Sequence, residues 1–187
     1  TVYDVTTASF HPSTAHNGTM NVNMDVADFG AWGQGKLGKY SFLNDGIDDS
    51  ISIPSSSYLP RGDGNESFSI SFWANNTEAL GSWEALVGRH RTGGTSFTDG
   101  YSLRYNNTVK DKLIFTVGKW ATSAATADCD WLRGIDSTFR HVVATYDHVA
   151  NESKIYLNGT PDTTGAKATG TTVAGTGATK IGRGGTN

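Results

Sequence analysis

Acidic side chains gather in one short stretch of the sequence, "NDGIDD". Asp45, Asp48 and Asp49 place three carboxylates within five residues, directly after Asn44. Calcium takes several oxygen ligands and accepts a mixture of carboxylates and backbone carbonyls. We therefore expect a calcium ion as a cofactor at these residues. The alternative is turn chemistry, in which Asp and Gly stabilise a turn between two strands.

Tryptophans are the second group of residues that could bind a ligand. Trp32, Trp120 and Trp131 lie in Gly-rich or polar segments, so we expect their rings to be exposed. A flat exposed ring packs against the C–H face of a sugar, while the sugar hydroxyls reach side-chain amides. The segment "GKWATSAATADCDW" is the preferred ligand loop. The alternative is that these rings cap the ends of the fold, and we expect Trp73 and Trp83, beside apolar strand residues, to be buried.

Patterns typical of catalysis or of transition-metal binding are missing. The glutamates stand singly along the chain, at Glu66, Glu78, Glu84 and Glu152. Glycanases need a pair of carboxylates at a fixed separation, and none of the strands predicted below carries such a pair. The histidines show neither His-x-Glu nor His-x₃-His spacing, and His141 is expected to be structural. No Gly-x-Ser-x-Gly motif or phosphate loop occurs, so we predict a protein without enzymatic activity.

The composition is that of a turn-rich β protein. Of 187 residues, 23 are Gly, and the charged share of 18% is below the usual quarter. The net charge of −3 gives no basic field for a nucleic acid, and no apolar run is long enough to span a membrane. Cys129 is the only cysteine, which excludes an internal disulfide. We expect it to be an apolar filler; a reactive thiol or an intermolecular disulfide is the alternative.

Short alternating segments predict the strands. In Ser67–Trp73 the apolar residues Phe68, Ile70 and Phe72 fall on one face and the serines on the other. Similar segments are Leu37–Leu43, Ser50–Ile53, Ala85–Arg89, Tyr101–Tyr105, Lys112–Val117, Arg140–Tyr146, Lys154–Leu157 and Ala178–Gly182. Gly-, Asn- and Asp-rich turns separate them, and Ala121–Ala127 is predicted to be a loop. Residues 160–177 are expected to form a long loop and an edge strand. We expect one all-β domain, 1–187, an antiparallel sandwich or barrel.

The clearest pattern is a hairpin. Both faces of Arg140–Tyr146 are apolar, which predicts a central strand covered on two sides. Asp147–Ser153 is a polar connection, and Lys154–Leu157 returns as the second strand. Asn158-Gly159 then favours a tight turn with positive φ.

These segments carry a resemblance to a known family. "GKLGKYSFLNDGIDDSISIP", "SFSISFWAN", "FRHVVATYDHVANESKIYLNG" and "ATKIGRGG" resemble, in this order along the chain, segments of laminin-G-like domains of the concanavalin A-like lectin/glucanase superfamily. The resemblance covers roughly Gly18 to Gly185. It implies a jelly-roll sandwich of two antiparallel sheets, secretion, and a binding or adhesive role. It also implies that the hairpin is scaffold, and that function lies on loops and on one sheet face.

Six sequons for N-glycosylation are present. They begin at Asn17, Asn65, Asn75, Asn106, Asn151 and Asn158. All fall in predicted turns or strand ends, where an attached glycan could project into solvent. The alternative is that an Asn-rich and Thr-rich chain produces sequons by chance.

The family's first and last strands have no clear counterpart in this sequence. We therefore expect that Thr1–Phe10 or the 171–187 tail pairs outside its own domain, because an uncovered sheet edge favours pairing with another chain. Taken together, the sequence predicts a non-catalytic extracellular or cell-surface recognition or adhesion module that binds carbohydrate. The alternative is a structural subunit of a glycosylated extracellular filament or surface assembly. The expected partners are glycans or a protein.

Overall fold

The protein is all-β in the part that the structure describes. The computed structural model describes residues 19–21, 32–34, 36–37, 40–42, 50–55, 59–75, 85–90, 100–105, 112–118, 125–130, 138–161, 166–167 and 174–182. Within these ranges every regular element is a strand and every strand pair is antiparallel. The predicted fold class is confirmed: two antiparallel sheets pack together without closing into a barrel.

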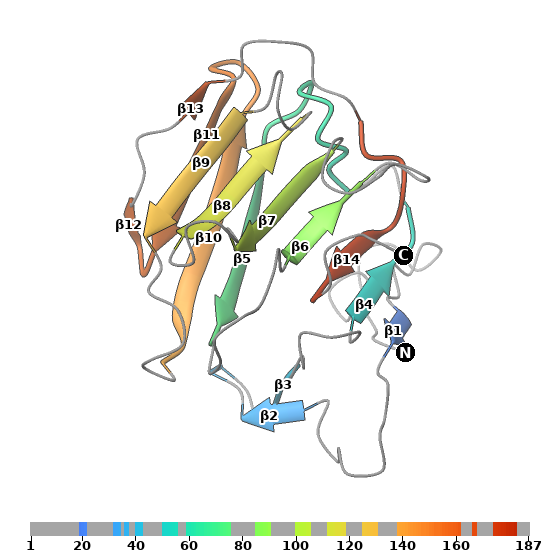
Figure 1. Ribbon diagram of the computed structural model, residues 1–187, viewed down its shortest axis with the longest axis vertical. Coiled ribbons are helices and arrows are strands. Elements are labelled where there is room, and N and C mark those ends of the chain that lie inside the picture. The colour runs from blue at the N-terminus through green and yellow to red at the C-terminus, as the bar shows by residue number, and fades with distance from the viewer. Residues whose placement is uncertain are drawn as a thin grey trace, which may run out of the picture.

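The larger sheet has seven strands among the described residues. In spatial order they are β1 (Thr19–Asn21), β4 (Ser50–Ile53), β14 (Thr179–Ile181), β6 (Ala85–Arg89), β7 (Tyr101–Tyr105), β8 (Lys112–Val117) and β9 (Ala125–Asp130). Figure 1 shows this sheet as the front layer. Only the backbone of β1 and β9 is described, so their residues are placed by register alone.

The smaller sheet lies behind it. Its strands are β12 (Thr160–Pro161), β11 (Glu152–Leu157), β10 (Arg140–Asp147) and β5 (Phe68–Ala74), and β13 (Ala166–Lys167) also pairs with β11. A separate hairpin of β2 (Trp32–Gln34) and β3 (Tyr40–Phe42) lies below the end of β5 (Figure 1). The short strands β12 and β13 confirm the edge strand expected within residues 160–177.

The core lies between the two sheets. It contains Leu103, Phe115 and neighbouring residues of the larger sheet, packed against Val142, Ile155 and others of the smaller sheet. Phe68 contributes a ring whose centroid lies 5.1 Å from that of Tyr101 and 5.9 Å from that of Tyr146. Burial raises the pKa of both tyrosine hydroxyls above the usual value. The alternation of β5 predicted this arrangement, since Phe68, Ile70 and Phe72 all face the core.

Two local predictions are corrected. The segment predicted as a loop, Ala121–Ala127, overlaps strand β9, which pairs with β8 along six residues. Strand β10 lies between β5 and β11 as expected, yet among the described residues only one of its faces is buried. Val142 and Ala144 are fully buried, whereas Val143 and Thr145 on the other face are partly exposed.

The C-terminal region pairs within its own chain. Strand β14 bonds to β4 on one side and to β6 on the other, so it lies inside the larger sheet. For these residues the expectation that the 171–187 tail pairs with another chain is wrong, because their backbone groups already have partners. Thr1–Phe10 lies outside the described residues.

None of the described residues forms a helix long and apolar enough to cross a membrane.

The turn between β10 and β11 is held by side chains. The Asp147 carboxylate oxygen Oδ1 accepts hydrogen bonds from the backbone N–H of Val149 at 2.8 Å and of Ala150 at 3.1 Å. Asn151 adopts a positive φ of 54°, and its Oδ1 accepts a 2.8 Å hydrogen bond from the Tyr146 hydroxyl. Asn tolerates this conformation better than most residues, so the turn is specified locally.

This turn predicts an acid-sensitive contribution to stability. The N–H groups of Ala150 and Val149 stabilise the Asp147 carboxylate, and they lower its pKa below the ordinary 3.8. A lowered folded-state pKa contributes stability above the unfolded value, and the contribution is lost as the pH falls through the folded value. We expect Asp147→Ala to lower the melting temperature at pH 7, and the gap to wild type to shrink as the pH falls below the ordinary 3.8 and through the lowered folded-state pKa. A gap of constant size from pH 7 to strong acid, measured by thermal unfolding, would contradict this role.

Candidate functional site

One side of the smaller sheet faces away from the core, and we call it the outer face. Because side chains alternate along a strand, this face carries Ser69, Ser71 and Trp73 of β5, His141, Val143, Thr145 and Asp147 of β10, and Glu152, Lys154 and Tyr156 of β11. All of them are partly or fully exposed. The outer face is thus a mixed polar and aromatic surface that the core does not need.

Two rings meet at one end of this face. Trp73 and His141 are direct cross-strand partners, and their ring centroids lie 5.1 Å apart with 31° between the planes. The His141 Nε2 lies 2.8 Å from the hydroxyl oxygen of Ser71 on the neighbouring strand. A serine hydroxyl has one donor and two acceptor sites, so this contact leaves hydrogen-bonding capacity for a ligand.

The tight turn after β11 fixes the backbone beneath His141. Asn158 and Gly159 have φ values of 51° and 83°, which confirms the predicted turn with positive φ. The backbone N–H of Asn158 donates to the His141 carbonyl at 2.8 Å, and Asn158 Oδ1 accepts from the His141 N–H at 2.9 Å. Both polar backbone groups of His141 are therefore bonded to one residue, which holds the imidazole beside Trp73.

A cation from the β2–β3 hairpin completes the arrangement. Lys36 Nζ lies 5.3 Å from the ring centroid of Trp73, within cation–π range. Lys36 is exposed, and the next residue, Leu37, is 81% exposed. A cation–π contact at an exposed site stabilises by about 0.5–1 kcal/mol, so a ligand can displace it. We call Ser71, Trp73, His141 and Lys36 the Trp73 cluster.

The opposite end of the outer face has a different charge. Asp147 caps the turn described above, and Glu152 Oε2 lies 2.9 Å from Lys154 Nζ. The hydrogen bond that Lys154 donates to the Glu152 carboxylate raises the pKa of Lys154. Between β5 and β10, His148 Nδ1 lies 2.8 Å from Ser67 Oγ, and the His148 backbone N–H donates to the same oxygen. The charged and polar side chains at this end are therefore bonded to other groups of the protein.

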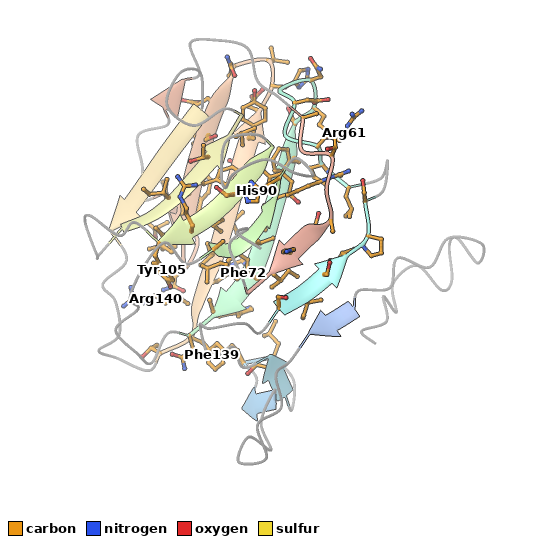
Figure 2. All side chains as sticks on the ribbon, turned by 45° about the vertical axis from the view of Figure 1, so that its right-hand side comes forward. Arg61, Phe72, His90, Tyr105, Phe139 and Arg140 are labelled. Carbon is orange, nitrogen blue, oxygen red and sulfur yellow. The ribbon has the colours of Figure 1, made fainter. Side chains whose placement is uncertain are left out.

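The larger sheet offers no comparable open surface at its centre. On the side of β7 and β8 away from the core, Ser102, Arg104, Ile114 and Thr116 are all at most 2% exposed. Arg104 Nη1 contacts Ser102 Oγ. Figure 2 labels His90, which directly follows β6, near this region. Because Ser102, Arg104 and Thr116 are buried, the outer face of the smaller sheet is the better candidate for ligand binding.

The residues predicted from sequence as sites are placed only in part. Trp32 lies in β2 with its backbone opposite Phe42, and its side chain is outside the description. Trp120, Trp131, Asp45, Asp48 and Asp49 lie outside the described residues, as does Trp83. Within the described ranges no group of three metal-ligating side chains occurs. The calcium site and the tryptophan ligand loop stay predictions. Cys129 lies in β9, opposite Leu113, with its side chain not described.

Four of the six sequons fall on described residues. Asn65 and Asn158 are exposed, whereas Asn75 and Asn151 are partly buried. Asn17 and Asn106 lie outside the described ranges. All four placed asparagines are in turns or just after strands, as predicted, while their glycosylation stays a prediction.

Trp73 was expected in the core, and the structure corrects this. It is only partly buried, and it lies on the serine face of β5 rather than with Phe72. The signal was present in the sequence, because an alternation that points Phe72 inward points its neighbour outward. Lys36 could not have been found in the same way, since no sequence pattern links it to a strand some 37 residues later.

The chain resembles several solved structures in its fold. The binding domain of Paraclostridial Mosquitocidal Protein 1 aligns with a TM-score of 0.59 at 13% identity, over 83% of this chain and 38% of that one. The binding domain of botulinum neurotoxin serotype D aligns with a TM-score of 0.55 at 14% identity, over 74% of this chain and 33% of that one. For botulinum neurotoxin type C the TM-score is 0.53 and the identity 16%, over 77% of this chain and 34% of that one. The chain thus spans little more than a third of the length of these structures. At these identities the likeness concerns the fold.

The family follows from the sequence itself. No curated protein sequence matches the chain. The model of a laminin-G-like family, that of the concanavalin A-like lectin/glucanases superfamily, matches residues 45–187, which include both sheets except β1. The resemblance of the sequence motifs is therefore confirmed, and the chain belongs to this laminin-G-like family of the concanavalin A-like lectin/glucanases superfamily.

Proposed function

We propose that this chain is a non-catalytic carbohydrate-binding module of an extracellular or cell-surface protein, and that it binds sugar at the Trp73 cluster. The observation that carries the proposal is the pairing of Trp73 with His141 on the outer face, bordered by Ser71 and Lys36. These side chains come from three separate elements and lie outside the core.

The chemistry of the cluster suits a sugar. The C–H groups of one pyranose face pack against an aromatic ring, while the hydroxyls around the ring need donors and acceptors. Trp73 supplies the ring. The Ser71 hydroxyl lies 2.8 Å from His141 Nε2, and the exposed Asn158 side chain accepts a hydrogen bond from the His141 N–H. Cell entry of botulinum neurotoxin type C, a fold relative, depends on interaction with two ganglioside molecules, which makes glycans the first ligand class to test.

The described carboxylates of the outer face support a role without catalysis. Asp147 and Glu152 are cross-strand partners on the outer face. Glycoside hydrolysis needs one carboxyl group whose pKa is raised, so that it can donate a proton. Here the pKa of Asp147 is lowered by backbone N–H groups, and Glu152 is engaged by Lys154. Asp147 therefore does not supply the general acid that hydrolysis requires.

The test is glycan binding by the wild-type protein and by Trp73→Ala. We expect the wild type to bind a subset of glycans on an array, and Trp73→Ala to weaken that binding about tenfold or more, because a central aromatic anchor supplies a large share of binding energy. Trp73→Phe should retain part of the affinity. Val149→Ala is the matched control, since Val149 is 82% exposed at the far end of the sheet.

The outcomes separate the alternatives. Absence of binding to any glycan by folded wild-type protein would contradict the proposed function. Binding that survives Trp73→Ala and fails in Trp120→Ala or Trp131→Ala would move the site to the predicted tryptophan loop. Circular dichroism and melting curves of each variant establish that a loss of binding is not a loss of folding.

A further inference from the structure

Resting on the proposed function, we propose that the sugar bound at the Trp73 cluster is acidic, and that Lys36 is the residue that selects it. The acidic group is a carboxylate or a sulfate on the sugar ring. Lys36 belongs to the β2–β3 hairpin rather than to the sheet, and it reaches the site across the face of Trp73.

The position of the ammonium group carries the inference. Lys36 Nζ lies 5.3 Å from the centre of the Trp73 ring, on the surface where a sugar would pack. An indole ring attracts a cation without neutralising its charge. Within the part of the chain that the structure describes, the ion pair of the outer face joins Lys154 to Glu152, and Lys36 is not part of it. A bound sugar therefore meets a full positive charge at its edge.

The charge pattern along the outer face favours an anion at this end only. Among the described residues, the carboxylates of the face are Asp147 and Glu152, and they lie at the opposite end of β10 and β11. Six residues of extended strand separate His141 from Asp147, which is about 20 Å at 3.3 Å per residue. This exceeds the screening length of about 8 Å at physiological salt, so these acids repel an anion at Trp73 only weakly.

The geometry also explains why the cation comes from a hairpin. Lys36 is exposed, so its long side chain can move from the ring to the edge of a bound sugar without losing buried contacts. An ammonium group then donates charge-assisted hydrogen bonds to a carboxylate or sulfate oxygen. Trp73 would thus supply affinity for the sugar ring, and Lys36 the preference for its charge.

The experiment is an array that presents the same oligosaccharides in neutral, carboxylated and sulfated forms, probed with wild type, Lys36→Gln and Lys36→Arg. We expect wild type to prefer an acidic form, and Lys36→Gln to weaken that binding about three- to tenfold while changing neutral forms less than about twofold. Lys36→Arg should keep most of the preference. The affinity for the acidic form should fall between about 50 and 500 mM NaCl, and comparison of the carboxylated and sulfated arms identifies the acid.

Lys154→Gln is the matched control, because it removes one lysine from the same face at the far end. It should leave the preference unchanged. Equal binding of neutral and acidic forms, or a preference that Lys36→Gln leaves intact, would overturn the role of Lys36 while the proposed function stands. Failure of wild type to bind any glycan would instead overturn the proposed function and this inference together. Loss of both neutral and acidic binding in Lys36→Gln would show a general contact and also refute selection by charge.

Discussion

Replacing Gly100 with alanine should strongly destabilise the protein. Gly100 precedes β7 with a φ of 84°, and a Cβ built on it would overlap the carbonyl oxygen of Arg89 and lie 2.9 Å from the Cα of Gly175. The Gly100 carbonyl also accepts a 2.7 Å hydrogen bond from the Gly118 N–H, so the segment cannot move freely. A left-handed conformation and a backbone clash together cost about 4 kcal/mol of unfolding free energy.

Gly159 provides the matched control. Its φ is 83°, almost the same as that of Gly100, yet a Cβ built on it would meet nothing within 4 Å. Gly159→Ala should therefore lose only the conformational part, about 1–2 kcal/mol. The two variants are compared by chemical denaturation with a common slope. Equal losses would mean that the contact of Gly100 with Arg89 relaxes on substitution, which would contradict a rigid glycine packing.

This glycine packing could not have been predicted from the sequence. Gly62, Gly100 and Gly175 are far apart along the chain, and each lies in an ordinary Gly-rich turn. The structure brings these glycines close to one another. A Cβ on Gly62 would overlap Gly100, and a Cβ on Gly175 would lie 2.5 Å from the Arg89 carbonyl oxygen. Turn composition predicts that a glycine is useful. The close approach of three backbone segments depends on tertiary structure, which turn composition does not reveal.

The strands were predictable where side-chain size and alternation agreed. Ser50–Ile53, Ala85–Arg89, Tyr101–Tyr105 and Lys112–Val117 have the predicted bounds. Strand β9 was missed because Ala and Asp have low intrinsic preference for strands, and its pairing with the apolar β8 decides its conformation. The very short β12 and β13 depend on the neighbouring β11 in the same way.

The candidate site, too, was predictable from local pattern only in part. The outward direction of Trp73 follows from the alternation of β5, although the size of the ring suggested burial. The contact of Trp73 with His141 needs the register of β5 with β10, and two residues 68 positions apart show no local pattern. Lys36 adds a third element. The residue types of the site can thus be read from the sequence, and only the fold shows that these residues lie together.

The position of the site at one end of β5 separates binding from the packing at the other end. Trp73 is the sixth of the seven residues of β5, on the side of the β2–β3 hairpin. The segment before β5 is attached instead to β6 and to the approach to β14, through Arg89. A change at Arg89 therefore tests stability with the binding residues untouched.

Arg89→Met should lower the free energy of unfolding by about 3 kcal/mol. Arg89 is 2% exposed, and its guanidinium donates to three backbone carbonyls: Leu59 at 2.8 Å, Pro60 at 3.1 Å and Gly177 at 3.2 Å. Its Nη2 also donates to Ser55 Oγ at 2.8 Å. Methionine fills a similar volume but leaves these acceptors without their donor, and an unsatisfied buried polar group is costly. Arg89→Lys should lose most of the same stability, because one ammonium group cannot replace the planar fork of donors.

Arg61→Met is the matched control, because the Arg61 side chain is exposed in the same loop that Arg89 holds (Figure 2). It should change the unfolding free energy by less than about 0.5 kcal/mol. The three variants are compared by denaturant unfolding, and each is assayed for glycan binding at low temperature, where Arg89→Met is still folded. We expect Arg89→Met to bind as wild type does under those conditions, because the Trp73 cluster makes none of the Arg89 contacts. A stability within 1 kcal/mol of wild type would show that solvent replaces the lost donors, and weakened binding by folded Arg89→Met would show that the two ends of β5 are coupled.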